Sequence, residues 1–143
     1  MKKPWKRVIV GAALVVVSAT AYQTVSWELQ IRALKEAAAT ATRFLGDLDA
    51  HEYEGAHALL GAPQQRAITM AALRAAEEQI ERKHGKPLGR VEVDEYNVDR
   101  GGTRARFFCD NAYAKESEPI HIVLMKTGAG WRVSEYRYDF GPA

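Results

Sequence analysis

The sequence predicts an α+β domain in which three helices pack on one curved antiparallel sheet of about four strands, preceded by an N-terminal transmembrane or signal helix. Apolar residues recur at helical spacing between residues 28 and 84 and with a period of two from residue 88 onward. Only short turns separate the later segments, so neighbouring strands run antiparallel. An apolar content of 47% with 27% charged residues is that of a globular protein and excludes general disorder.

The N-terminus has the pattern of a secretory signal. Residues 1–7 are rich in Lys and Arg, residues 8–17 are continuously apolar, and Ala19-Thr20-Ala21 fits the small-x-small rule for cleavage after Ala21. Cleavage would release the domain into the periplasm, with Tyr22 as its first residue.

A retained signal anchor is the alternative that we favour. Residues 8–27 carry no charged side chain, and a span of about 20 residues crosses the hydrocarbon core of a bilayer. Tryptophans flank this stretch at the two interface positions, as in an aromatic belt. The residues expected to contact the membrane are Trp5, Val8, Leu14, Val17 and Trp27. The chain therefore divides into an anchor or signal peptide at 1–27 and a domain at 28–143.

The charge distribution orients the protein. The chain has 20 basic and 18 acidic residues, and four of the basic ones lie in the first seven positions, which leaves 16 against 18 for the rest. Nothing in this balance favours nucleic-acid binding by the domain. Either N-terminal alternative places the basic end in the cytoplasm and the domain beyond the inner membrane.

Three helices are expected in the first part of the domain. In residues 28–48 the apolar positions advance by alternating steps of four and three, which places them on one helix face. Residues 50–60 form a short second helix that ends at Gly61-Ala62-Pro63. A third helix covers 64–84 and stops at Gly85 and Pro87.

Four strands are expected after the helices, at 88–98, 103–115, 120–126 and 131–140. The apolar phase shifts within the first strand at Asp94-Glu95 and within the last near Ser134-Glu135, which predicts a β-bulge at each place. Arg100-Gly101-Gly102 predicts the first hairpin turn.

This layout resembles the NTF2-like superfamily over about residues 30–140. The resemblance rests on FLGDLDAHEYEGAHALL (44–60), the long helix after it, and the closing strand GWRVSEYRYDF (130–140). It implies a cone-shaped sheet wrapped around helices. The superfamily includes isomerases, dehydratases and non-catalytic proteins, and its enzymes use a carboxylate inside the cone with a Tyr or His partner. A looser similarity of layout links the chain to membrane-anchored assembly factors of respiratory oxidases.

No complete catalytic, metal or cofactor site is predicted. The polar cluster Asp47, Asp49, His51, Glu52, Tyr53, Glu54 and His57 is at best half a metal site and reads as a solvated helix with Tyr53 turned inward. Cys109 lies between apolar neighbours and is interpreted as structural. The strand residues considered for an acid–base pair are Asp110, Tyr113, His121 and Tyr96.

The strand at 120–126 points to a partner because it is apolar on both faces. If its Ile and Leu residues cover the helices, Val123 and Met125 face away from them and need another cover. Face-to-face pairing of sheets is what the NTF2-like resemblance implies. The predicted partner-binding residues are His121, Val123, Met125, Tyr136 and Tyr138.

A basic and aromatic surface is a second feature of the strands. The arginines Arg104, Arg106, Arg132 and Arg137 could meet acidic partners or lipid headgroups, or could pair across strands with Glu92, Asp94 and Glu135.

These observations predict a non-catalytic, membrane-anchored binding or assembly module. Its partner would be another protein, a second copy of the chain or a small apolar ligand. Two alternatives stay open. One is a small isomerase or dehydratase with its acid–base site in the cone. The other is an accessory subunit of a larger membrane complex, in which the small residues Gly11, Ala12 and Ala13 make the span itself an interface.

Overall fold

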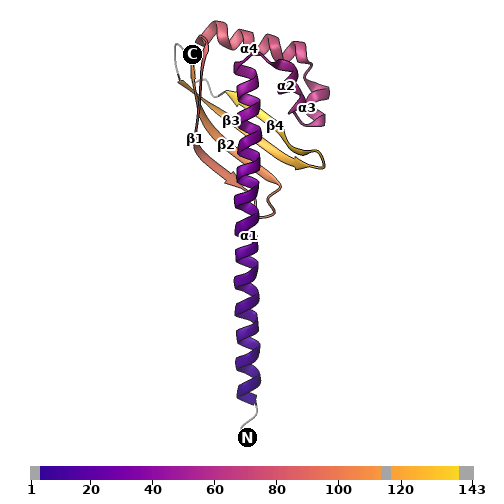
Figure 1. Cartoon of the computed structure of the whole chain (residues 1–143), viewed down its shortest axis with the longest axis vertical. Coiled ribbons are helices and arrows are strands. Elements are labelled where there is room, and N and C mark those ends of the chain that lie inside the picture. Colours follow the sequence, from indigo (N-terminus) through magenta and orange to yellow (C-terminus); the bar gives the residue numbers. More distant parts are fainter. Residues whose placement is uncertain (1–3, 114–116, 139–143) are drawn as a thin grey trace.

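The computed structural model describes the backbone of residues 4–113 and 117–138, and the side chains of 26–88, 96–109 and 119–138. In that part of the chain the α+β class is confirmed, with the helices first and the strands after them (Figure 1). The helices are α1 (Pro4–Asp49), α2 (Tyr53–Ala58), α3 (Ala62–Ala67) and α4 (Met70–His84). The strands are β1 (Pro87–Val98), β2 (Arg104–Tyr113), β3 (Ser117–Thr127) and β4 (Gly130–Tyr138).

Helix α1 runs without a break through the predicted boundary at residue 27. Its C-terminal half crosses one face of the sheet, and its N-terminal half extends away from the domain (Figure 1). The sheet-facing side begins with small residues, which let the helix approach the strands closely, and ends with larger ones. The buried residues of α1 are Ala33, Ala37, Ala41, Phe44, Leu45 and Leu48.

The predicted membrane span lies outside the described side chains. Among the side chains that are described, no helix combines the length and the apolar character that crossing a bilayer requires. Residues 8–25, and with them Val8, Leu14 and Val17, fall outside this set, as does Trp5.

The prediction of a single helix at 64–84 was wrong, because the segment forms two helices, which raises the number in the described part to four. Ile68 takes an extended conformation, and the Thr69 hydroxyl accepts a hydrogen bond of 3.1 Å from the N–H of Ala72 to cap α4. The His57 ring donates to the Ile68 carbonyl at 2.7 Å. Two β-branched residues and a side-chain donor therefore end α3 and start α4 at this point.

The sheet is an antiparallel meander in the order β1-β2-β3-β4. Both predicted bulges are confirmed, because the β1–β2 register shifts between Val93 and Glu95, and Ser134 has no partner in the β3–β4 register. The bulge at Ser134 returns Tyr136 and Tyr138 to the face of the sheet that carries Trp131 and Val133. The inner face packs on α1 through Ala105, Phe107, Cys109, Ile120, Ile122, Leu124, Trp131 and Val133.

The outer edge of β4 is closed by the segment after α2. The N–H of Gly61 donates to the Val133 carbonyl and the N–H of Val133 donates to the Leu59 carbonyl, both at 2.8 Å. This short parallel pairing satisfies backbone groups that would otherwise form an open edge.

The β1–β2 turn rests on α1. Gly102 has φ +64°, and a Cβ at this position would lie 3.3 Å from both the Leu29 carbonyl oxygen and the Ala33 Cβ. Glycine is therefore required here by its backbone conformation and by the close approach to the helix. Asp99 organises the turn by accepting hydrogen bonds from the N–H groups of Thr103 (2.6 Å) and Arg104 (3.0 Å).

Candidate functional site

A buried carboxylate lies where α4 meets β4. Glu77 is only 8% exposed. The Tyr138 hydroxyl donates to its Oε2 at 2.9 Å, and the Tyr136 hydroxyl lies 3.5 Å from its Oε1. Burial raises the pKa of Glu77 to about 7, and Asp49 adds to the shift, whereas the tyrosine hydrogen bonds oppose it. A carboxyl with this pKa can hold or release a proton near neutral pH.

Glu77 is not among the residues predicted from the sequence, although its position carries a signal. The three buried residues of α4 are Leu73, Glu77 and His84, which follow one another at steps of four and seven. That stripe faces the interior, so an ionisable residue within it had to be buried and had to find a partner. The tyrosine partners depend on the Ser134 bulge, which turns them toward Glu77.

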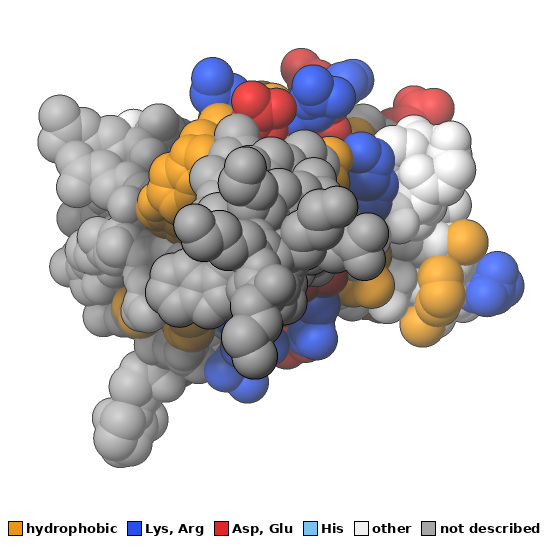
Figure 2. All heavy atoms as spheres, turned by 90° about the horizontal axis from the view of Figure 1, so that it is seen from below, with side chains coloured by type: hydrophobic (Ala, Val, Ile, Leu, Met, Phe, Trp, Pro, Cys, Tyr) orange, Lys and Arg blue, Asp and Glu red, His pale blue; other side chains and the backbone are white. Residues whose placement is uncertain are grey.

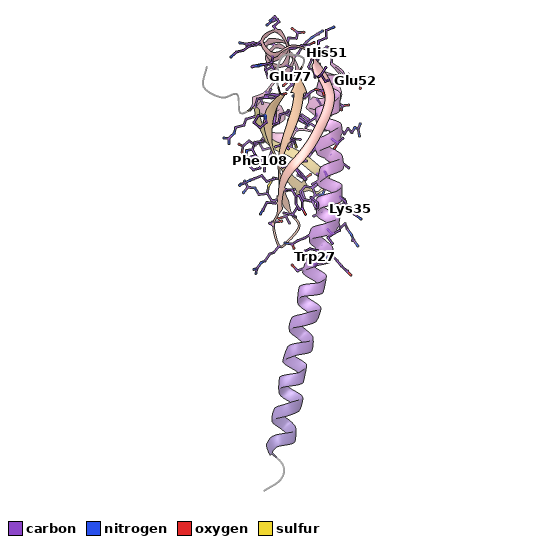
Figure 3. All side chains as sticks on the ribbon, turned by 90° about the vertical axis from the view of Figure 1, so that its left-hand side faces the viewer. Trp27, Lys35, His51, Glu52, Glu77 and Phe108 are labelled. Carbon is purple, nitrogen blue, oxygen red and sulfur yellow. The ribbon has the colours of Figure 1, made fainter. Side chains whose placement is uncertain are left out.

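A second group of side chains borders this carboxylate at the surface (Figure 3). The His51 Nε2 lies 2.7 Å from Glu81 Oε2, and its ring stacks on Tyr53 at a centroid distance of 5.9 Å. The Arg74 guanidinium lies 5.8 Å from the centre of the Tyr53 ring. Burial raises the pKa of Tyr53, and the carboxylates of Glu77 and its α4 neighbours add to this. These contacts join α2 and the end of α1 to α4.

The predicted inward turn of Tyr53 is confirmed, since this side chain is buried. His51, Glu52 and Glu54 of the same polar cluster are exposed, and His57 is half-buried at the α3–α4 junction. Across the described side chains, no three His, Cys, Asp or Glu residues come together as a metal site.

The space around Glu77 is small. The cavity that it shares with Asp49, His51 and Tyr53 has a volume of about 10 Å³, which is at the lower limit for a single water molecule. A surface groove of about 740 Å³ lies between α2 and α4, over Tyr53, but Glu77 does not line it. The carboxylate therefore has the protonation chemistry of an acid–base group without room for a substrate beside it.

The predicted partner-binding residues divide between the two faces of the sheet. His121, Val123 and Met125 share the outer face, whereas Tyr136 and Tyr138 pack on the core. Val123 is 2% exposed and Met125 is 40% exposed. Val123 is thus already covered within the single chain, and of the three outer-face residues predicted to bind a partner, Met125 is the exposed one.

The outer face also carries a hollow of about 360 Å³ beside Phe108. Its lining residues are Tyr96, Asn97, Asp99, Arg104, Arg106 and Phe108. Figure 3 labels Phe108 on the sheet. The Phe108 ring stacks on His121 with their centroids 4.6 Å apart, which connects the hollow to β3.

The charge of this hollow is positive. Arg104 and Arg106 are exposed, and neither forms an ion pair within the described part of the chain. Burial alone would raise the pKa of Asp99, but the hydrogen bonds from Thr103 and Arg104 outweigh it and lower that pKa. The Asp99 carboxylate is already engaged by these donors.

Of the other strand candidates, the two with described side chains, Tyr96 and His121, do not form an acid–base pair with Glu77. Tyr96 lines the outer hollow and His121 lies on the outer face, both away from Glu77. Cys109 is buried in the core, as predicted for a structural cysteine. The side chains of Asp110 and Tyr113 lie outside the described residues.

Comparisons with family models, with curated proteins and with solved structures find no match to this chain. The resemblance to the NTF2-like superfamily therefore stays a prediction that rests on the sequence patterns and their layout.

Proposed function

We propose that the protein is a non-catalytic binding module, anchored in the inner membrane by its N-terminal segment, that receives a partner protein on the outer face of its sheet. The observation that carries the proposal is the hollow beside Phe108, which combines exposed aromatic surface with two arginines that form no ion pair with the described side chains. Arginine and aromatic side chains are the residues that most often dominate protein interfaces. We infer that the partner presents an acidic segment with apolar side chains.

The anchor is supported by the continuity of α1. A cleaved signal peptide is followed by an independent domain, whereas here one helix covers Pro4–Asp49 and packs its last turns into the core. Because the C-terminal half of α1 is part of the domain core, the orientation of a retained anchor in the membrane would fix the orientation of the sheet.

The absence of catalysis is proposed from the geometry at Glu77. An isomerase or dehydratase would use this carboxylate with Tyr138 as its proton-handling pair. Such an enzyme needs a cavity large enough for its substrate next to the carboxyl, and small-molecule sites usually measure about 300–1,000 Å³. The cavity at Glu77 measures about 10 Å³. We therefore assign the Glu77–tyrosine contact to the interior packing and keep the enzyme as the second candidate.

The binding face can be tested with a photo-crosslinking amino acid at Met125, with the same replacement at Met70 as a matched control. Both methionines are exposed, and Met70 lies at the start of α4, away from the outer face. In cells that make the full chain, we expect a discrete adduct from position 125 that is weakened several-fold by Arg106→Glu. Mass spectrometry of the adduct gives the partner and the attached segment.

The mass of the adduct separates the two kinds of partner. Twice the 15.9 kDa of the chain means self-association through the sheet, and any other discrete mass means a different protein. Equal adducts from positions 125 and 70, or adducts that Arg106→Glu leaves unchanged, would show that this face is not the binding site.

A further inference from the structure

The end of the domain from which α1 emerges has an apolar rim. Trp27 is 65% exposed, and Leu29 and Ile31 beside it are also exposed. Trp27 and Ile31 lie one helical turn apart and so share a side of α1. Tryptophan and aliphatic residues next to a span are typical of the zone where hydrocarbon meets headgroups.

Basic side chains, with acidic ones among them, lie on two sides of α1 in the view toward this end of the domain (Figure 2). Arg32 and Lys35 lie on the exposed side of α1, opposite its buried stripe, whereas Arg100 and Arg104 come from the β1–β2 turn and the start of β2. All four are exposed, and none forms an ion pair within the described residues. The basic groups therefore flank the helix on two sides.

The helix geometry sets their distance from the predicted interface. At about 1.5 Å of rise per residue, Arg32 lies roughly 7.5 Å and Lys35 roughly 12 Å beyond Trp27 along α1. The β1–β2 turn lies at the same height along α1, since Gly102 packs against Leu29 and Ala33. These distances are similar to the Debye length of about 8 Å at physiological salt. The long side chains of Arg and Lys can in addition extend toward the membrane surface.

Among the described side chains, three acidic groups at this end oppose the four basic ones, and two of the three are engaged within the domain. Glu28 is exposed on α1. Glu36 accepts a hydrogen bond of 3.1 Å from the Trp131 indole and lies 3.6 Å from Lys126. Asp99 is held by the turn. The local balance is positive although the folded part of the chain has slightly more acidic than basic residues.

We propose that this end of the domain docks on anionic phospholipid headgroups of the membrane that holds the anchor, through Arg32, Lys35 and Arg100. The proposal rests on the anchor of the proposed function. Docking at two sides of α1 fixes the tilt of the domain, so that the sheet stands upright on the bilayer and its outer face points sideways.

The full chain in nanodiscs provides the test. A fluorophore is attached to a cysteine at Gly101, and in a separate protein to one at Gly46, and quenching by a headgroup-labelled lipid is measured. No heavy atom lies within 4 Å of a Cβ at Gly46, and at Gly101 the nearest is 3.8 Å away, so both replacements fit. Cys109 is buried and does not compete for the label. Gly46 lies about 28 Å beyond Trp27, too far for headgroup contact.

Phosphatidylglycerol in a phosphatidylcholine disc is expected to increase quenching at Gly101 but not at Gly46. Because each basic residue near an anionic surface changes the docking equilibrium about fivefold, Arg32→Glu with Arg100→Glu should reduce the equilibrium constant for docking by more than tenfold. The control pair Arg66→Glu with Lys83→Glu makes the same charge change on α3 and α4, at the other end of the domain, and should leave quenching unchanged.

The outcomes separate this proposal from the one on which it rests. Headgroup docking is overturned, and the anchor is not, by either of two results. One is equal quenching at Gly101 in neutral and anionic discs, and the other is an equal reduction of that quenching by both charge-reversed pairs. Loss of the Met125 adduct in the Arg32/Arg100 protein, with lipid quenching unchanged, would assign the basic end to an acidic protein instead. A chain that does not stay with the discs in flotation contradicts the anchor itself.

Discussion

Glu77→Gln is expected to make the domain more stable at pH 8 and to remove most of the dependence of its stability on pH between about 4.5 and 7. The pKa of Glu77 is raised from 4.5 to about 7 in the folded state. Below pH 4.5 the carboxyl is protonated whether the chain is folded or unfolded, and its protonated form is fully compatible with burial. As the pH rises to about 7, only the unfolded state ionises freely, so the free energy of unfolding falls by about 3 kcal/mol.

The glutamine keeps an oxygen that accepts from the Tyr138 hydroxyl, but it cannot ionise. Above pH 7 the free energy of unfolding of the variant should therefore exceed that of the wild type by about 2 kcal/mol. Urea unfolding of residues 28–143 at several pH values measures this. Glu78→Gln is the matched control, because Glu78 is the adjacent residue and only makes a surface ion pair with Arg74. If the Glu77→Gln protein and the wild type lost stability in parallel between pH 5 and 7, the raised pKa of Glu77 in the folded state would be disproved.

Val123→Asp should destabilise the fold, whereas Met125→Asp should leave it stable and abolish partner binding. Val123 is 2% exposed, so an aspartate there places a charge in a desolvated position. Arg106 lies opposite on β2, and its charge would offset part of the cost of burying the aspartate. The free energy of unfolding should therefore fall by about 2–3 kcal/mol.

Met125 is the matched control because Arg104 lies opposite it in the same register. With 40% exposure, its replacement should change the free energy of unfolding by less than about 0.5 kcal/mol. Urea midpoints of the two variants measure their stability. A photo-crosslinking amino acid in place of Phe108 measures partner binding in the same variants. Similar small losses in both variants would mean that Val123 is reachable on the outer face after all.

Much of the sheet could be predicted from the sequence because its signals are local. The change of apolar phase within β1 and within β4 marked both bulges, and Gly101-Gly102 marked the first hairpin. Helix α1 was predictable from spacing over residues 28–48. The break at Ile68 and Thr69 was missed, although Thr69 is a local N-cap signal. The His57 ring, which reaches the Ile68 carbonyl from another helix, adds a tertiary contact that no local pattern shows.

The site was harder to predict than the fold because its parts meet only through tertiary packing. Glu77 resembles any other glutamate of an acidic helix until Tyr138 is turned toward it by the Ser134 bulge. Val123 shows the opposite difficulty, since an apolar residue on the outer face suggested an open surface and is instead covered within the chain. Alternation along a strand assigns a face, but exposure on that face depends on the side chains of neighbouring strands.

The anchor is the claim on which the other proposals depend, and the native N-terminus tests it most directly. Protein isolated from membranes of the cells that make it should be measured intact by mass spectrometry. We predict that residues 1–21, including Lys2 and Lys3, are retained in the membrane-bound chain. A mature protein that begins at Tyr22 and is recovered in the soluble fraction would contradict the account.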